Sequence, residues 1–117
     1  MKGIFTALLT PFNADYAVNE KSLQKLVEFN LEKGVNGFYV GGSTGEGMLM
    51  SPEERKEVFR IVKKAAGDRV DMIAHCGSVS TDDAISMAKE AEALGYTAVS
   101  AVAPYYYSFS YDAIRKY

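Results

Sequence analysis

The sequence predicts an α/β fold in which a parallel sheet is built from consecutive strand–helix units. Short apolar runs alternate with longer segments whose apolar residues recur every three or four positions. Three of the longer segments end at a glycine, and Gly34, Gly67 and Gly95 lie 33 and 28 residues apart. That spacing is typical of a βα unit. Repeated units of this kind give a parallel sheet with right-handed crossovers.

The first unit begins with the apolar run 3–9, which we expect to be a strand buried on both faces. A turn at residues 10–13 closes the strand, and a polar loop follows. Asn19 is expected to cap a helix over 20–33, because its side chain can accept a hydrogen bond from the first free N–H groups. Gly34 then ends that helix in a left-handed conformation.

The second unit has a strand over 35–40, followed by the sequence Gly-Gly-Ser-Thr-Gly-Glu at 41–46. Ser51 is expected to cap the next helix, with Pro52 at its first position and Glu54 completing a capping box. The apolar face of this helix is predicted to comprise Val58, Ile61, Val62 and Ala65.

The third unit is expected to have a strand over 69–76 and a helix that starts near Thr81. The inward face of that helix is predicted to comprise Ala84, Ile85, Ala88 and Ala91. A fourth strand over 97–103 follows, then a loop with three tyrosines at 105–107. A new helix begins around Tyr111.

Two architectures are built from such units, an open doubly wound sheet and a (β/α)₈ barrel. The segment 112–117 has a helical pattern but no glycine or proline that would end it. Complete barrels have roughly 250 residues. We therefore expect residues 1–117 to be the N-terminal half of a single barrel domain, four βα units with the last helix cut short.

Composition and charge narrow the class of protein. A content of 48% hydrophobic and 24% charged residues is typical of soluble globular proteins. The net charge of −2 argues against a nucleic-acid or anionic-membrane partner. No apolar run approaches the roughly 18 residues of a membrane span, and no signal-peptide pattern is present. The single cysteine, Cys76, cannot form an intramolecular disulfide, which fits a reducing cytosol, so we expect a cytoplasmic protein. Cys76 itself is expected to be a buried apolar residue.

Both architectures place ligands at the C-terminal ends of the strands. There, the stretch 41–46 offers backbone N–H groups and the hydroxyls of Ser43 and Thr44, which suit a small carboxylate or phosphate. An ordinary strand-to-helix turn is an equally good interpretation. For His75, a hydrogen-bonded structural role is favoured over acid–base catalysis. The tyrosines at 105–107 could act as a general acid or base, stack on a sugar or pack in an interface.

The sequence lacks the common motifs that bind metals or nucleotide cofactors. No His, Cys, Asp or Glu residues have metal-ligand spacing, and neither a P-loop lysine nor a dinucleotide-binding glycine fingerprint is present. We therefore expect no metal and no cofactor. Two sites stay open at this point: a carboxylate pocket with phenolic proton carriers, and a neutral sugar pocket.

Three motifs together resemble one enzyme family. Thr10-Pro11-Phe12, the stretch 41–46 and Pro104-Tyr105-Tyr106 follow the first, second and fourth strands. This order resembles the pyruvate-dependent class I aldolases that include N-acetylneuraminate lyase and dihydrodipicolinate synthase. Several segments look like the sialic acid lyase branch, namely 8–12, Tyr39-Val40, Ile73-Ala74-His75, Ser100-Ala101-Val102 and 106–110. Dihydrodipicolinate synthase or a related pyruvate aldolase is the alternative branch.

The resemblance implies retro-aldol cleavage of N-acetylneuraminate to N-acetylmannosamine and pyruvate through a Schiff base on a lysine. It implies that Ser43 and Thr44 bind the substrate carboxylate and that Thr44 also takes part in a proton relay with tyrosines. It further implies that Tyr106 reaches into a neighbouring subunit's site, and that the intact enzyme is a homotetramer.

The same resemblance places the Schiff-base lysine and a fifth-strand tyrosine beyond Tyr117, so the chain alone is expected to be inactive. A different class of function remains possible. A half-barrel would have two open sheet edges, which favour pairing with another half, so a non-catalytic role in binding or assembly is the second hypothesis.

Overall fold

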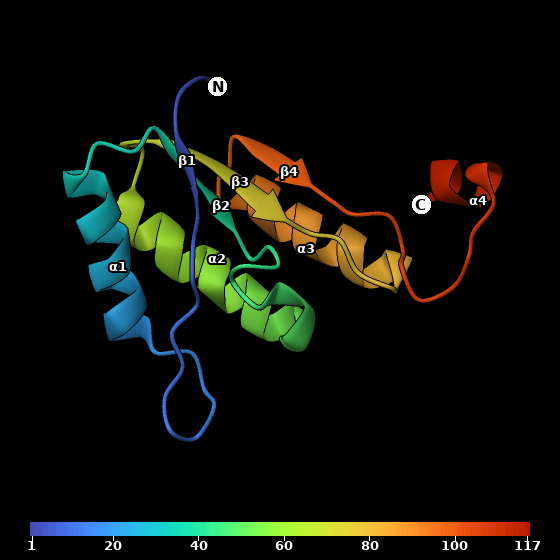
Figure 1. Cartoon of the computed structure of the whole chain (residues 1–117), viewed down its shortest axis with the longest axis horizontal. Coiled ribbons are helices and arrows are strands. Elements are labelled where there is room, and N and C mark those ends of the chain that lie inside the picture. The colour runs from blue at the N-terminus through green and yellow to red at the C-terminus, as the bar shows by residue number, and fades with distance from the viewer.

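The computed structural model describes all residues from 1 to 117 and shows a single parallel sheet with helices along one face (Figure 1). Its strands, hydrogen-bonded in the order β1-β2-β3-β4, are β1 (Phe5–Ala7), β2 (Gly37–Val40), β3 (Asp71–His75) and β4 (Ala98–Ser100). All three pairings are parallel, so each strand lies beside the next one in the chain. The prediction of a parallel sheet built from consecutive units is confirmed.

Each strand is shorter than the apolar run that predicted it. The runs 3–9, 35–40, 69–76 and 97–103 contain strands of three to five residues. A parallel ladder extends only where neighbouring strands overlap, and isolated ladder bonds continue beyond it. For example, the N–H of Leu8 donates to the Tyr39 carbonyl at 3.0 Å, and the N–H of Cys76 donates to the Ser100 carbonyl at 2.7 Å.

The helices begin where their capping residues predict. They are α1 (Glu20–Glu32), α2 (Pro52–Ala66), α3 (Thr81–Ala93) and α4 (Tyr111–Lys116), with a short 3₁₀ turn at Gly47–Leu49. Asn19 accepts a hydrogen bond from the Ser22 N–H at 2.9 Å, as predicted for the N-cap of α1. Ser51 and Glu54 form the predicted capping box of α2. None of the helices combines the length and the apolar composition that a membrane crossing needs.

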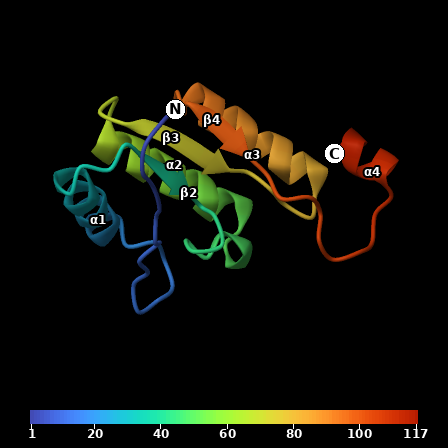
Figure 2. The ribbon, with the colours of Figure 1, turned by 45° about the horizontal axis from the view of Figure 1, so that its top comes forward.

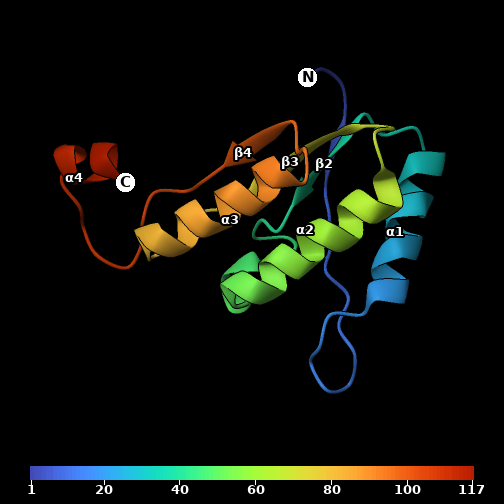
Figure 3. The same ribbon diagram turned by 180° about the vertical axis from the view of Figure 1, so that it is seen from behind.

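The hydrophobic core lies between the sheet and the helices α1, α2 and α3, which Figure 3 shows from their own side. Alternate residues of β2 and β3 face these helices, because side chains of a strand point to opposite faces in turn. The fully buried side chains of this core include Leu23, Val27, Phe38, Val40, Val58, Phe59, Val62, Met72 and Met87. Burial of this one face therefore orients the other face of each strand toward the barrel interior.

Two burial predictions are wrong. The first strand is not buried on both faces, since Ala7 is exposed and Leu9 is 54% exposed, because no element covers the inner face of the sheet. On α3, the predicted inward residue Ile85 is 46% exposed, whereas Met87 is completely buried. Ile85 lines an apolar groove with Val99 at the β4 edge, where the sheet ends.

Candidate functional site

The loop 41–47, which we call the glycine loop, follows β2 at the C-terminal edge of the sheet. Its direction reverses through left-handed conformations at Gly41, with φ of 71°, and at Glu46, with φ of 57°. The N–H groups of Gly45 and Gly47 both donate to the Gly42 carbonyl at 3.0 Å. The Glu46 N–H donates to the carbonyl of Ser43 at 3.0 Å. These bonds make the loop a closed turn of fixed shape.

Two glycines of the loop stand where no side chain fits. A Cβ on Gly47 would lie 1.9 Å from the Gly41 carbonyl oxygen, and a Cβ on Gly45 would lie 2.7 Å from the Leu8 carbonyl oxygen. The buried hydroxyl of Thr10 donates to the Gly45 carbonyl at 2.7 Å. The end of β1 therefore holds the glycine loop at short range, which accounts for the Thr10 that begins the first motif.

Ser43 and Thr44 lie at the exposed tip of this turn. Their backbone N–H groups donate to no protein acceptor, and their hydroxyls form no hydrogen bond within the chain. Free backbone N–H groups with hydroxyls beside them are donors of the kind that bind anions. The structure thus brings together the two residues predicted to bind a carboxylate, with their donors unused.

The side chain of Arg55 is only 3% exposed, and its hydrogen-bond partners lie just after β3 and at its end. It extends from α2 to the end of β3, where Nη1 donates to the Gly77 carbonyl at 2.8 Å. Its Nη2 lies 2.9 Å from Nδ1 of His75 and also donates to the His75 carbonyl. Arg55 therefore joins a helix to the strand end beside the loop.

This contact determines the protonation of His75. A guanidinium can only donate hydrogen bonds, so Nδ1 of His75 must accept and the neutral ring carries its proton on Nε2. Burial lowers the pKa of His75, and the charge of Arg55 lowers it further, while a hydrogen bond with the Gly41 backbone acts in the opposite direction. His75 is thus buried and hydrogen-bonded, in agreement with the structural role favoured from the sequence.

Tyr39 occupies the inner face of the sheet next to His75. Its hydroxyl lies 2.9 Å from the Ser100 hydroxyl, and its ring centroid lies 6.0 Å from that of His75. The ring also lies against the glycine loop, since a Cβ on Gly42 would be 2.5 Å from Tyr39 Cε1. The three residues come from three different strands.

Sequence reasoning assigned no site role to Arg55 or Tyr39. For Arg55 a signal was present, because it lies three residues before Val58 and seven before Val62, on the apolar face of α2. A charged residue on such a face requires buried partners. For Tyr39 the alternation of β2 indicates only that it faces away from Phe38 and Val40.

The structure does not bring Tyr106 to the glycine loop. The segment 101–110, which we call the aromatic arm, leads away from β4 to α4 (Figure 2). Tyr106 is 74% exposed and packs edge-on against Tyr107 with ring centroids 4.8 Å apart. The hydroxyl of Tyr117 anchors α4 by accepting from the Ser78 N–H and donating to the Ser78 carbonyl, both at 2.9 Å.

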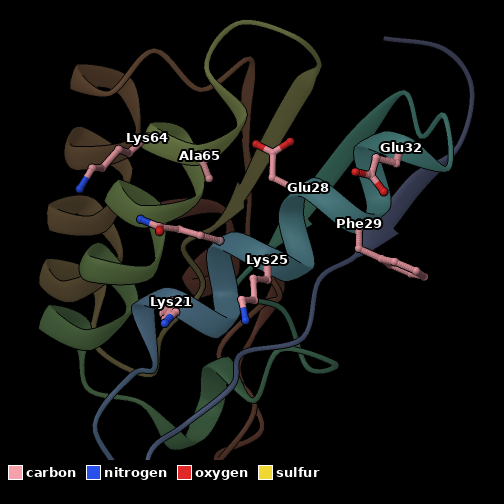
Figure 4. Close-up of a pocket in the computed structure, with 8 residues that line it drawn as sticks. Lys21, Lys25, Glu28, Phe29, Glu32, Lys64 and Ala65 are labelled. Carbon is pink, nitrogen blue, oxygen red and sulfur yellow. The ribbon is translucent and has the colours of Figure 1, made fainter.

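Two other features carry less chemistry. Cys76 is buried, and burial raises the pKa of its thiol to about 11, so it is the inert apolar residue that we expected. A hollow of about 650 Å³ lies between α1 and α2 and is lined mainly by long charged side chains (Figure 4). Lys21, Lys25 and Lys64 belong to this surface, and Lys64 forms an ion pair with Glu20 at 3.2 Å. This hollow lies on the outer helical surface.

Comparison with known proteins agrees with this geometry. A model of the dihydrodipicolinate synthetase family matches residues 1–117. The N-acetylneuraminate lyase of Pasteurella multocida is 52% identical over 118 aligned residues, which cover 100% of this chain and 40% of that protein. The chain thus spans about 40% of the length of the curated relatives it matches.

Solved structures extend the comparison to the fold. The structure of CdNal from Clostridium difficile in complex with mannosamine superposes with a TM-score of 0.97 at 42% identity, covering 99% of this chain and 40% of that one. A putative dihydrodipicolinate synthetase from Pseudomonas aeruginosa superposes with a TM-score of 0.94 at 29% identity, with the same coverage of 99% and 40%. The four βα units therefore correspond to the N-terminal half of the barrel, as predicted.

Proposed function

Because the chain belongs to the dihydrodipicolinate synthetase family, we propose that it forms the carboxylate-binding part of a pyruvate-dependent lyase of the aldolase type. The glycine loop carries this proposal, since its shape is fixed by Thr10 and by internal turns while the donors of Ser43 and Thr44 stay free. These donors suit the carboxylate of pyruvate or of a sugar acid.

Within the family, we propose that the substrate is a sialic acid, cleaved to N-acetylmannosamine and pyruvate. The identities of 52% and 45% to the lyases of Pasteurella and Fusobacterium, against 36% to a solved dihydrodipicolinate synthase and 29% to the Pseudomonas putative synthetase, support this choice. The alternative is dihydrodipicolinate synthesis or a related pyruvate aldolase reaction. When residues 1–117 form part of a complete barrel, consumption of N-acetylneuraminate rather than of aspartate semialdehyde would support the lyase.

The proposed chemistry needs a nucleophile from outside residues 1–117. A protonated Schiff base of the keto carbon acts as an electron sink, so that the neighbouring carbon–carbon bond can break. None of the four strands contains a lysine that could form it from the barrel interior. In this proposal Ser43 and Thr44 hold the carboxylate, and Thr44 joins a proton relay with tyrosines. Tyr106 enters the site of a neighbouring subunit in a homotetramer, and the buried free thiol of Cys76 fits a cytoplasmic location.

The binding role is tested by titrating the ¹⁵N-labelled chain with pyruvate and following its amide resonances. We expect saturable shifts centred on Ser43 and Thr44. The methyl ester of pyruvate is the matched control, because it lacks the negative charge, and it should produce much smaller shifts. Equal shifts with acid and ester, or shifts confined to other regions, would contradict carboxylate binding at this loop.

The missing nucleophile is tested separately by borohydride reduction in the presence of pyruvate. We expect no covalent adduct on the 117-residue chain by mass spectrometry, whereas a complete family member treated in parallel should gain one. An adduct on any lysine of this chain would show that the nucleophile lies within it.

A second function is favoured by the open surfaces of the sheet. β1 and β4 are both edge strands, and Leu9 and Val102 on the inner side are exposed. Edge strands with unpaired backbone groups, together with exposed apolar side chains, favour association with the sheet of another molecule. We therefore propose assembly of half-barrels as the alternative role. Light scattering at several concentrations tests it, and a monodisperse monomer would contradict it.

A further inference from the structure

We propose that Arg55 and His75 are positioning residues that hold the glycine loop in its ligand-binding shape, with Tyr39 and Ser100 as a second support for the same loop. This inference rests on the proposed carboxylate-binding function and goes beyond it by assigning the residues that prepare the site. The loop is supported from two sides, by Arg55 and His75 from α2 and β3, and by Tyr39 and Ser100 across the inner face of the sheet.

The first observation is a buried cation without an acidic partner. Arg55 takes part in none of the ion pairs of the structure, and its Nε has no hydrogen-bond partner. Burial lowers the pKa of Arg55, as expected for a charge removed from water. Retaining such a group costs free energy that well-packed apolar residues would not cost. All hydrogen bonds of its side chain go to His75 and Gly77, at the end of β3 and just beyond it.

The second observation is that His75 lies between Arg55 and the first residue of the glycine loop. The Arg55 guanidinium occupies Nδ1 of His75. The His75 carbonyl, also bound by Arg55, lies 3.8 Å from the Cβ position of Gly41. Arg55 therefore connects α2 to the His75 backbone, which packs against the first residue of the glycine loop.

Tyr39 and Ser100 support the next residue of the loop. The Tyr39 ring fills the space beside Gly42 where a side chain would otherwise lie. The hydrogen bond between the hydroxyls of Tyr39 and Ser100, at 2.9 Å, holds that ring across the sheet. Gly41 and Gly42 are thus braced from two directions.

The free donors follow directly after these two glycines. Because the peptide planes of Gly42 and Ser43 set the directions of the next N–H groups, bracing them fixes where Ser43 and Thr44 present their donors. The charge of Arg55, which has no acidic partner, lies at the His75 carbonyl beside Gly41. An unpaired cation favours a nearby anion more strongly than a cation paired with a carboxylate would. Both effects favour a carboxylate.

The test compares Arg55→Met with Arg55→Lys and with the control Arg60→Met. Arg60 lies on the same helix but forms an exposed ion pair with Glu90 at 2.7 Å. In the ¹⁵N spectrum of the His75 ring, the unmodified chain should show an unprotonated Nδ1 and a protonated Nε2. Arg55→Met should move both resonances toward the average of the two tautomers and shift the amide resonances of 41–44. Arg55→Lys should restore part of both signals, and Arg60→Met should change neither.

Pyruvate titration of the same variants separates this proposal from the proposed function. We expect the dissociation constant of pyruvate to be about tenfold larger for Arg55→Met, which is a typical effect of losing one charge-assisted interaction. If the unmodified chain binds no pyruvate, the function fails, while the His75 and loop signals still decide whether Arg55 positions the loop. Unchanged His75 tautomer and unchanged loop amides in Arg55→Met would overturn the positioning role.

A second pair of variants covers the case in which Arg55→Met does not fold. Tyr39→Phe removes only the hydroxyl that bonds to Ser100, and Tyr96→Phe removes another buried hydroxyl, which donates to the Phe59 carbonyl at 3.0 Å. We expect Tyr39→Phe to shift the amide resonances of Gly42 and Ser43, and Tyr96→Phe to leave them in place. Equal effects of the two variants on the loop would overturn the support by Tyr39.

Discussion

The loops that follow β2 and β4 lie at the same edge of the sheet and both carry candidate site residues, yet they are built differently. In the glycine loop, four glycines are buried. Thr10, which follows β1, Tyr39 of β2 and His75 of β3 all lie against its backbone. In the aromatic arm, nearly every residue is exposed, and the rings of Tyr107 and its neighbours contact one another.

This difference separates two components of the proposed site. The groups that would bind a carboxylate are held by contacts within the chain, so their geometry is already set. The phenol of Tyr106 has no such support, and its geometry depends on contacts that the chain does not make with itself. Exposed aromatic side chains gathered on one segment are typical of surfaces that bind another protein.

The largest effect should come from Gly47→Ala. The added Cβ would lie 1.9 Å from the Gly41 carbonyl oxygen, which is backbone and cannot rotate away. We expect about 3 kcal/mol of destabilisation, in the range of severe overpacking, and displacement of the whole loop. Urea unfolding and the amide spectrum measure both. Gly34→Ala is the control, because Gly34 has a φ of 80° but no atom within 4 Å of the new Cβ, and it should cost only about 1 kcal/mol.

A smaller effect is expected for Thr10→Val, which keeps the shape of the side chain but removes its hydroxyl. The Gly45 carbonyl would lose its buried donor, and such a loss costs about 2 kcal/mol. Loop amide resonances should shift while those of the aromatic arm stay unchanged. Thr81→Val, the same change at an exposed position, should alter stability by less than about 0.5 kcal/mol. Equal losses for the two variants would show that Thr10 does not hold the loop.

The sequence predicted the helices better than the strands, because helix ends depend on local chemistry. The N-caps at Asn19 and Ser51 use bonds to residues three positions away, which a sequence pattern can show. Strand ends depend on the neighbouring strand, and the inner face of β1 is exposed for a reason that local pattern does not contain. The apolar pattern of residues 3–9 therefore predicts more burial than the structure has.

The same distinction applies to the candidate site. Ser43 and Thr44 were found because the glycine-rich stretch shows its chemistry within six residues. Arg55 and Tyr39 acquire their roles only through contacts with His75, which lies 20 or more residues away from each of them in the chain. The register of the parallel sheet determines such contacts, and amino-acid composition does not reveal that register.

The stability of the region around the glycine loop should also depend on pH, through His75. Burial and the Arg55 charge lower the pKa of His75 from its ordinary value of 6.5. Below that value the unfolded chain binds a proton that the folded chain does not, so the free energy of unfolding falls as pH falls through 6.5. The slope should reach at most about 1.4 kcal/mol per pH unit.

Urea midpoints measured from pH 7.5 to pH 5 test this expectation, and His75→Asn should flatten the curve in that interval. Carboxyl groups with a lowered pKa, such as Glu54, lose their contribution only near and below pH 4.5, and they do so in both proteins. An identical slope in the unmodified chain and the variant would show that His75 does not titrate as its surroundings require.

The smallest effect should come from Tyr106→Phe. Its hydroxyl forms no hydrogen bond and its ring is largely exposed, so unfolding free energy should change by less than about 0.5 kcal/mol. Pyruvate-induced shifts at Ser43 and Thr44 should also persist, because the glycine loop is braced without the aromatic arm. Lost pyruvate binding in this variant would mean that Tyr106 reaches the loop, within one chain or across a pair of chains. The two loops would then form a single site, and their different support would reflect assembly rather than independence.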